Sequence, residues 1–510
     1  MVEAIKSQAA HANLAVTENG AVGYQALSDG LVEFFFKVSS MRRYNPVAKM
    51  VAFLKAAAGD REMALRLLFY VRDVRQGVGE RQLFRDIFNQ LTDEEIRKLY
   101  KLLPEYGRWD DVVFVLTSPN VKPQTKQEVS LYLKQKLEMD AANALSGKPI
   151  SLLAKWLPSP RRVSKAKVAL AKELCETWGW TQEKYRKTLS SLRKILKVVE
   201  QSMTANEWGE IEYEKLPSKA AMLYREAFSR HDTSRYNDYL ASLKNGTARV
   251  NARTLFPYEI VSQYSRHGLF EEDDLLEEQW KALPVPTGIF ENAIVVRDGS
   301  GSMMAPLSGG RATALDVATS LAILMADNLK GEFHGKFITF SHCPKLVDLT
   351  GCKTLREKIR LARKEAECDN TNIQRTMSLI LNTAVANKIP QSEIPMVVII
   401  SDLEFDVQAD EVRRMVDLQP FQVKETLFKA IQRQWQSFGY QLPKLVFWNV
   451  MNRSGAMPIQ PDEAFNGLRL VSGFSQNVLD ILNGNETMSE AVRKKLMSPR
   501  YDAVSEALRK

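Results

Sequence analysis

The segment from Ile294 to Ser302 constrains the fold more than any other part of the sequence. The apolar run Ile294-Val295-Val296 leads almost directly into Asp298-Gly299-Ser300-Gly301-Ser302. A carboxylate and two hydroxyls at alternate positions of a tight loop can face one point, and the glycines let the backbone turn closely. Such oxygens are the ligands of a hard divalent cation. The sequence therefore predicts a buried strand that ends in a metal-binding loop.

The C-terminal part of the chain alternates short apolar runs with helical stretches. Runs suited to buried parallel strands are Ile294–Val296, Lys336–Phe340, Met396–Ile400, Leu445–Trp448 and Leu468–Val471. Helices are expected at Ala314–Leu329, Leu355–Ala366, Ile373–Asn387, Val423–Phe438 and Asn477–Leu482. This alternation predicts an α/β doubly wound, Rossmann-like sheet. Ligands of such sheets bind beyond the carboxyl ends of the strands.

Two further oxygen ligands are expected from the ends of other strands. Thr371 opens a helix at a suitable interval, and Asp402 ends the most apolar strand, Val397–Asp402. Structural roles remain open for the same side chains. Ser300 and Ser302 could cap a helix N-terminus, and Asp402 could cap the helix that follows it.

These residues resemble the von Willebrand factor A (vWA) family, from about Phe290 to about Asn483. The resemblance implies that Asp298, Ser300 and Ser302 coordinate a divalent ion, Mg²⁺ first and Mn²⁺ second, with Thr371 and Asp402 completing the site directly or through water. It also implies an open coordination position for the carboxylate of a protein partner. One departure is the sequence Leu403-Glu404-Phe405-Asp406 after Asp402. Glu404 and Asp406 could add negative charge near the ion or block the open position.

The first half of the chain has a helical pattern. In Arg61–Val74, the residues Met63, Leu67, Val71 and Val74 follow one another at three- and four-residue steps, on one helix face. Similar segments, broken by glycine and proline, continue through Val199, with almost no strand-like alternation. Successive short helices with polar turns predict an all-α, HEAT-like repeat domain.

A second resemblance rests on several motifs of this half: Arg72–Arg81, Pro104–Asp111, Lys155–Ser159, Leu192–Lys194 and Glu212–Ser218. They are similar to the TROVE module, named after telomerase, Ro and vault proteins, in the variant of a TROVE-related family. A TROVE-like half followed by a vWA-like domain is the order found in Ro ribonucleoproteins. The resemblance implies a ring with a basic lining that binds structured, aberrant or single-stranded RNA. The vWA-like domain would close the ring or recruit a partner.

Positive charge is concentrated in one part of the helical half. The net charge of the chain is +9, and the segment from Lys148 to Lys197 holds 13 basic residues and three acidic ones. Such a field attracts polyanions. If the chain acts as Ro proteins do, we expect phosphate contacts from Lys155, Arg161, Arg162, Lys165, Lys167, Arg193, Lys194 and Lys197. A solvated helical face without a ligand is the alternative.

Aromatic and arginine side chains of the helical half also have two interpretations. Trp156, Trp178 and Trp180 could stack on bases, or they could form core between helices. Arg72, Arg75 and Arg81 are expected to bridge neighbouring acids such as Asp73, Glu80 or Asp110.

The acidic cluster Glu271–Glu278 and the following Pro284-Val285-Pro286 predict a domain boundary. We therefore expect an N-terminal segment over residues 1–30, a TROVE-like helical domain over 31–285, a vWA-like domain over 286–490 and a C-terminal helical tail over 491–510. Four irregularly spaced cysteines favour reduced thiols in a cytoplasmic protein. Neither a membrane-spanning run nor a signal peptide is expected.

The function predicted is non-catalytic binding of RNA, with a divalent metal in the vWA-like domain. The alternative is a metal-dependent protein-interaction scaffold that binds no RNA. Enzymatic activity is not expected, because the sequence offers no nucleophile–base pair and its five histidines show no metal or catalytic spacing. A nuclease would need the paired carboxylates of two-metal chemistry.

Overall fold

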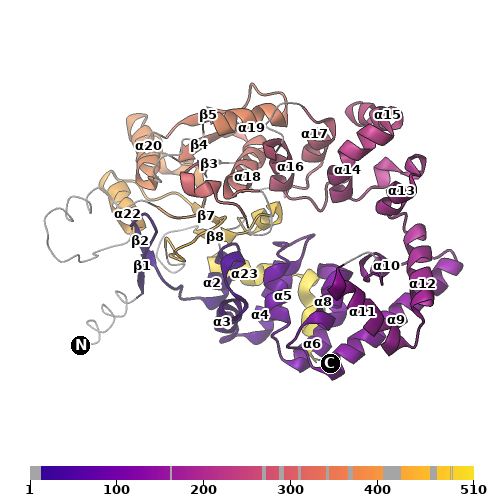
Figure 1. The fold of residues 1–510 in the computed structure, drawn as a ribbon. Helices are drawn as coiled ribbons and strands as arrows, with labels where there is room; N and C mark the ends of the chain where they lie inside the picture. Colours follow the sequence, from indigo (N-terminus) through magenta and orange to yellow (C-terminus); the bar gives the residue numbers. More distant parts are fainter. Residues whose placement is uncertain are drawn as a thin grey trace. The chain divides into compact units, whose positions relative to one another are not determined.

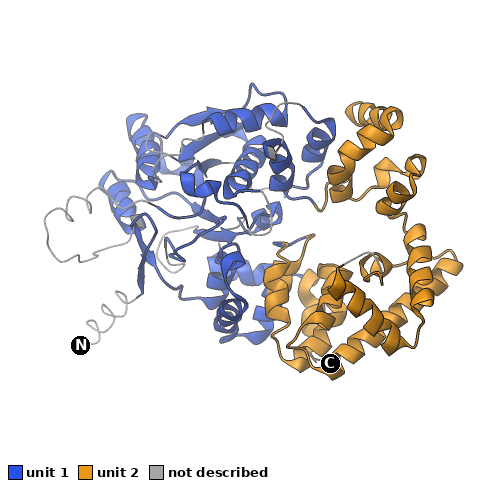
Figure 2. Cartoon of the chain, in the orientation of Figure 1, with its two compact units in different colours: residues 1–67, 76–78, 255–498 blue, residues 68–75, 79–254, 499–510 orange. Residues whose placement is uncertain are grey.

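The computed structural model describes residues 13–160, 164–266, 272–285, 292–307, 312–340, 344–365, 372–405, 427–459, 468–482, 484 and 486–509 (Figure 1). The chain divides into two compact units (Figure 2). The sheet unit comprises residues 1–67, 76–78 and 255–498, and the helical unit comprises residues 68–75, 79–254 and 499–510. Among the described residues, no helix is long and apolar enough to cross a membrane.

A six-stranded mixed sheet forms the centre of the sheet unit. Its strand order is β5-β4-β3-β6-β7-β8, and all neighbours are parallel except β5, which runs antiparallel to β4. The bounds are β3 Ala293–Asp298, β4 Lys336–Phe340, β5 Leu346–Asp348, β6 Met396–Ser401, β7 Leu445–Asn449 and β8 Arg469–Ser472. Counted within the sheet, this is the order 3-2-1-4-5-6 of a doubly wound fold. The predicted sheet is confirmed, and β5 is a strand that the apolar runs did not indicate.

Helices cover both faces of this sheet. Ile399 is in register with Val296 and with Phe447, so the three side chains share one face. On that face Phe428 of α22 (Leu427–Ser437) packs edge-on against Phe447, with ring centroids 4.7 Å apart. Arg297 points to the other face, where it donates to Thr319 of α18 (Ala314–Asn328).

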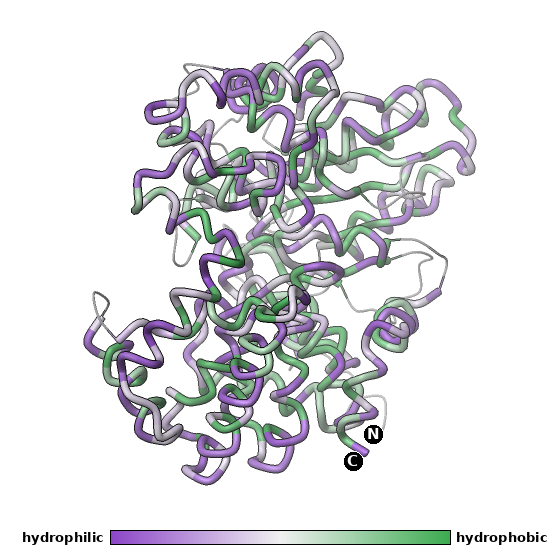
Figure 3. The backbone as a smooth tube through the Cα atoms, turned by 90° about the vertical axis from the view of Figure 1, so that its right-hand side faces the viewer, coloured by the Kyte–Doolittle hydropathy of each residue, from purple (hydrophilic) through white to green (hydrophobic). Residues whose placement is uncertain are grey.

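Burial on both faces explains why these strands read as continuous apolar runs. Every residue of β3, β7 and β8 is buried, and only the first residue of β6 is partly exposed. Figure 3 colours the backbone by hydropathy, with hydrophobic segments in green and hydrophilic segments in purple. Expected helices are present as α18, α19 (Leu355–Lys364), α20 (Ile373–Ala386) and α22, whereas residues 476–482 form the 3₁₀ helix η8 (Gln476–Leu482).

The sheet unit also includes segments from outside the expected vWA-like range. They are the hairpin β1 (Leu14–Val16) and β2 (Val22–Tyr24), the helices α2 (Gly30–Phe36), α3 (Pro46–Ala57), α16 (Pro257–Arg266) and α17 (Asp274–Lys281), the short η1 (Ser40–Arg43) and most of α23 (Met488–Leu496). The short η5 (Gly301–Met304), η6 (Gly331–Phe333) and η7 (Gln391–Glu393) lie within that range. The expected boundaries at residues 30 and 285 therefore differ from those of the units.

The acidic cluster expected at a boundary has a structural role instead. Glu277 of α17 is buried, and its carboxylate accepts hydrogen bonds from the backbone N–H groups of Leu355 and Arg356, at 2.7 and 3.1 Å. These N–H groups begin α19, so Glu277 satisfies donors that lack intrahelical partners. This contact joins α17 to the sheet unit.

The helical unit is all-α in its described residues, as predicted. It contains α5 (Gln82–Phe88), α6 (Asp93–Leu99), α7 (Leu103–Tyr106), α8 (Trp109–Thr117), α9 (Pro123–Leu145), α10 (Leu153–Trp156), α11 (Lys165–Trp178), α12 (Gln182–Ile195), α13 (Val199–Ala205), α14 (Ser218–His231), α15 (Thr233–Lys244) and α24 (Asp502–Arg509), with the short η2 (Tyr100–Leu102), η3 (Trp208–Glu210), η4 (Tyr213–Lys215) and η9 (Pro499–Tyr501). The helix α4 (Arg61–Arg72) contains the boundary between the units.

A buried ion pair holds α4 to α8 in the helical unit. The Arg72 side chain donates from Nε and Nη2 to Asp111 Oδ2, at 3.0 and 2.6 Å, and Arg85 donates to Asp111 Oδ1 at 2.7 Å. Gly107 lies against this pair, where an added Cβ would come within 2.8 Å of the Arg72 guanidinium carbon. The structural interpretation of Arg72 is therefore confirmed, with Asp111 as its partner.

The C-terminal residues also belong to the helical unit rather than to a separate tail. The Tyr501 ring stacks on Tyr106 with centroids 5.7 Å apart, and Arg500 bonds to the buried Asp73 at 2.8 Å. α24 packs on α6, where Lys98 Nζ donates to the carbonyl of Leu508. The expected tail over 491–510 is therefore divided, because α23 belongs to the sheet unit.

Candidate metal site and candidate nucleic-acid interface

Two buried aspartates lie at the centre of the sheet's carboxyl edge. Asp298 ends β3, and Asp402 follows β6, the strand paired with β3. The chain runs from β3 to β4 on one side, and β6 lies on the other. This is the switch point at which doubly wound sheets bind ligands. The strand order thus brings together two carboxylates that are far apart in the sequence.

The loop after β3 arranges its oxygens around Asp298. Asp298 Oδ1 accepts the N–H of Ser300 at 2.9 Å, and Oδ2 accepts the hydroxyl of Ser401 at 2.5 Å. The hydroxyl oxygens of Ser300 and Ser302 are 3.0 Å apart. Ser300 precedes η5 but makes no side-chain capping bond to it. The Ser300 side chain therefore does not cap η5, contrary to the alternative interpretation of this residue.

The electrostatics of the two carboxylates favour a cation. Burial raises the pKa of the Asp298 carboxyl above its usual range. Burial, together with the charge of Asp298, raises the pKa of Asp402 to about 7. A hydrogen bond from Ser302 works in the opposite direction on Asp402. Two buried like charges beside two hydroxyls form a set of hard oxygens, which fits the preferences of Mg²⁺ and Mn²⁺.

The remaining expected ligand, Thr371, lies outside the described residues, as does Asp406. Within the described parts of the chain, no group of three or more His, Cys, Asp or Glu side chains is arranged so that these side chains alone could hold a metal ion. A metal site here would therefore depend on the serine hydroxyls as well as on the two aspartates.

Glu404, which was expected near the ion, is directed to backbone amides instead. Its Oε1 accepts the N–H groups of Arg453 and Ser454, both at 2.7 Å, and its Oε2 accepts the N–H of Glu18 at 2.8 Å. The carboxylate is fully buried, and these three bonds compensate its charge. Leu403, between Asp402 and Glu404, has a φ of 63°, in the left-handed region that is unusual for a branched residue. Glu404 is therefore a structural anchor whose carboxylate oxygens accept backbone N–H groups.

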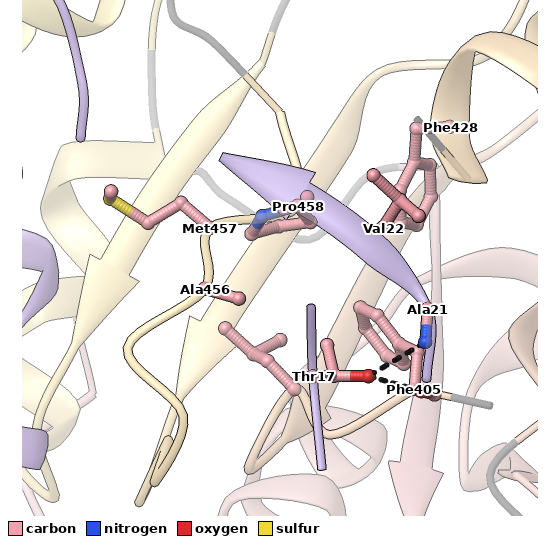
Figure 4. A pocket seen from close by; sticks show the side chains of 10 residues that line it. Thr17, Ala21, Val22, Phe405, Phe428, Ala456, Met457 and Pro458 are labelled. Atoms are coloured by element: carbon pink, nitrogen blue, oxygen red, sulfur yellow. Dashed lines mark hydrogen bonds between the residues drawn. The ribbon is translucent and has the colours of Figure 1, made fainter. Parts of the chain in front are cut away.

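The β1–β2 hairpin lies against the segment that follows Asp402. Thr17 Oγ1 donates to the carbonyl of Phe405 at 2.6 Å and accepts the N–H of Ala21 at 2.9 Å (Figure 4). Tyr24 and Met457 exchange backbone hydrogen bonds at 2.7 and 2.8 Å. A small apolar pocket lies between these segments, with Val22, Phe405, Phe428 and Pro458 in its lining. The N-terminal hairpin therefore packs at the carboxyl ends of the strands, against the segment that follows Asp402.

Sequence reasoning missed Arg453, which lies beside Asp402. It follows β7, and its Nη2 is 3.5 Å from Asp402 Oδ2 and 2.8 Å from Glu18 Oε2. A basic residue in a loop after a strand next to β6 is a signal that could have identified it. No comparable sequence signal could have identified Glu18, because it lies in the N-terminal hairpin and not in a loop that follows a strand of the sheet.

Among the residues expected to contact phosphate, Lys165, Lys167 and Lys194 are exposed on α11 and α12. Lys155 is partly buried in α10, and Arg161 and Arg162 lie outside the described residues. The Arg193 side chain donates to the carbonyls of Ala154 and Leu157, both at 2.8 Å, and Lys197 forms an ion pair with Glu212. Arg193 therefore has a structural role, and its contact with phosphate stays a prediction.

The three tryptophans differ in their environment. Trp178 is buried, and its Nε1 donates to Ser130, so this ring belongs to the core. Trp156 is partly exposed, with the Arg108 guanidinium 5.2 Å from its ring centroid. Trp180 is also partly exposed and lies under the ammonium group of Lys184, 4.4 Å from its centroid. Stacking on a base is compatible with Trp156 and Trp180 only.

Comparisons with known proteins match both units. Residues 292–507 match the domain of unknown function DUF7788, and residues 179–285 match the domain of unknown function DUF2828. The chain is 30% identical to the uncharacterized protein L728 of Acanthamoeba polyphaga mimivirus, over 93% of this chain and 86% of that protein. The chain belongs to the family of that protein.

Each of the two matching domains contains part of the candidate sites. The DUF7788 match includes Asp298, Asp402 and Arg453, and the DUF2828 match includes α12. Glu18 lies outside both. The crystal structure of the Deinococcus radiodurans Ro (RSR) protein is similar with a TM-score of 0.40 and 13% identity, covering 90% of this chain and 93% of that one. A similarity of this size is too low to establish a shared fold.

Proposed function

We propose that the chain is a non-catalytic RNA-binding protein whose helical unit contacts RNA through α11 and α12. The observation that carries this proposal is the exposed face of α12. Lys184, Lys187 and Lys194 follow one another at three- and seven-residue steps, so they lie on one side of the helix. All three are exposed, and Glu183 is the one acidic residue of α12.

Physical features of this face favour a nucleic acid over simple solvation. Lys187 pairs with Glu183, but both side chains are about two-thirds exposed, and such pairs hold little energy. Their charges therefore remain accessible to phosphates. Trp180, beneath Lys184, adds a partly exposed ring on which a base could stack. Lys165 and Lys167 extend the charge onto the first turn of α11.

We further propose that the sheet unit is a vWA-like domain that binds Mg²⁺ or Mn²⁺. Asp298, Ser300 and Ser302 would hold the ion, with Asp402 and Thr371 completing the set. Support comes from the doubly wound strand order, the position of the loop at the switch point and the two buried carboxylates. When bound, the ion would offer a coordination position to a carboxylate of a protein partner. The alternative of a metal-dependent scaffold without RNA binding rests on this site alone.

Charge reversal tests the RNA-binding face. Fluorescence anisotropy would follow a labelled single-stranded RNA with the wild type and with the Lys184→Glu/Lys187→Glu/Lys194→Glu variant. Loss of three phosphate contacts should reduce the slope of log Kd against log salt by roughly 2, because each contributes about 0.7 for single strands.

A matched variant, Lys353→Glu/Arg360→Glu/Lys364→Glu, changes the same charge at exposed residues in and just before α19 of the sheet unit. It should bind RNA with a slope close to that of the wild type. If the two variants weakened RNA binding equally, the effect would be non-specific electrostatic attraction, and the assignment of RNA binding to α12 would be wrong. Absence of RNA binding by the wild type, with a protein partner captured only without EDTA, would favour the scaffold.

A further inference from the structure

We propose that Arg453 and Glu18 set the metal affinity of the sheet unit and couple it to docking of the N-terminal hairpin. This inference rests on the proposed metal site at Asp298 and Asp402. Arg453 forms an ion pair with one carboxylate of that site, with Nη2 3.5 Å from Asp402 Oδ2. The same nitrogen is 2.8 Å from Glu18 Oε2. One guanidinium is thus shared between a proposed metal-site carboxylate and the hairpin.

A hydrogen bond holds the backbone of Arg453 in place, whereas its guanidinium group can move. Its N–H donates to the buried Glu404 carboxylate, which anchors the loop after β7. Its Nε is buried and has no hydrogen-bond partner among the described residues. The side chain is about one-fifth exposed. A short rotation of the side chain can therefore shift the guanidinium between Asp402 and Glu18 without moving the loop.

Competition between the guanidinium and a metal ion follows from this position. A cation coordinated at Asp402 and an arginine within hydrogen-bonding reach of the same carboxylate repel each other, and burial reduces the screening between them. Metal binding should therefore move Arg453 away from Asp402. Glu18 is the acceptor already in contact with it on the other side. Glu18 thus favours the metal-bound arrangement, whereas Arg453 opposes it.

Hydrogen bonds to Glu404 hold the hairpin that carries Glu18 beside the proposed metal site. The N–H of Glu18 donates to Glu404, and Asn19 Nδ2 donates to the Glu404 carbonyl at 2.7 Å. Because Glu18 attracts Arg453 more strongly once the metal is bound, metal binding should stabilise the docked hairpin. By linkage, docking should raise metal affinity by the same factor.

Isothermal titration of the full chain with Mn²⁺ tests the coupling. Glu18→Gln should weaken Mn²⁺ binding by about tenfold, and Arg453→Gln should tighten it by about tenfold, the scale of outer-shell changes at metal sites. The double variant should behave like Arg453→Gln, because Glu18 acts through Arg453. Glu332→Gln and Arg360→Gln, at exposed residues of the same unit, are the matched controls and should bind as the wild type does.

Hydrogen exchange of residues 14–24 supplies a second measurement. Mn²⁺ should slow exchange in the wild type and leave it unchanged in Arg453→Gln. If the wild type binds Mn²⁺ but both single variants bind it equally well, the coupling is wrong and the metal site stands. If the wild type and Asp298→Ala both fail to bind Mn²⁺, the metal site is wrong, and the coupling fails with it.

Discussion

Replacing Asp111 by asparagine should cost the helical unit much of its stability. The Asp111 carboxylate accepts hydrogen bonds from three elements of the unit, through Arg72, Arg85 and the N–H of Arg108. Arg72 is 1% exposed, and burial lowers the pKa of its guanidinium. Asparagine keeps the shape but removes the charge, which leaves a buried guanidinium without a counter-ion. Breaking a buried pair in this way costs about 3–5 kcal/mol.

The neighbouring residue Asp110 provides a control on the same helix. It pairs with Arg85 at 2.9 Å and with Arg81 at 3.8 Å, but its side chain is 19% exposed and Arg81 is about half exposed. When Asp110 is neutralised, Arg85 keeps Asp111 as its counter-ion, so Asp110→Asn should destabilise the helical unit less than Asp111→Asn does. Native-state hydrogen exchange at the amides of α8 gives the local free energy of opening, which is preferable to one melting temperature for a chain of two units. Equal losses in the two variants would refute the assignment of Asp111 as the central acceptor.

Three further predictions concern the candidate sites. Asp298→Ala should abolish the stabilisation by Mn²⁺, which would be about 2.7 kcal/mol at a hundredfold excess over Kd; a thermal shift that persists in the variant would place the metal elsewhere. Trp180→Ala should weaken single-stranded RNA binding by about 1 kcal/mol or more. Trp178→Ala should lower the melting temperature of the helical unit by more than Trp180→Ala does, because Trp178 is the buried ring of this packed pair. Hydrogen bonds from Lys197 and Lys215 lower the pKa of Glu212 to about 2, so this carboxylate stays ionised down to acidic pH and continues to neutralise Lys197. Glu212→Gln should therefore strengthen RNA binding in anisotropy measurements, and lowering the pH from 7 to 5 should not reproduce that gain.

Local sequence patterns were sufficient to predict the sheet. Apolar runs give strands that are buried on both faces, and the predicted strand at 396–400 corresponds to β6. Asp402 could be assigned because its position depends only on where that strand ends. β5 was missed because its outer residues are exposed and its three residues give no apolar run.

Contacts between distant segments could not be predicted in the same way. The hydrogen bond between the Glu18 N–H and Glu404 joins residues 386 positions apart, and no periodicity reports it. The compact units differ from the expected domains for a similar reason. The acidic segment before Pro284 has the composition of a linker, but the Glu277 carboxylate accepts hydrogen bonds from the first backbone N–H groups of α19. Composition alone cannot separate a charged linker from a charged helix that caps another.

The basic segment illustrates a further limit of sequence patterns. The count of lysine and arginine identified a basic segment, but it could not separate Arg193, which donates to backbone carbonyls, from exposed residues such as Lys184 and Lys187. That distinction depends on which side of α12 faces the core, and buried Tyr185, Leu189 and Leu192 define that side.

Ultraviolet crosslinking of a uridine-rich single-stranded RNA to the full chain tests the central claim most directly. Mass spectrometry of the crosslinked peptides would locate the RNA along the chain. RNA binding through the helical unit predicts crosslinks within residues 164–195, and these should be lost in the Lys184→Glu/Lys187→Glu/Lys194→Glu variant. Crosslinks confined to residues 292–482, or none at all under conditions of low salt, would contradict it.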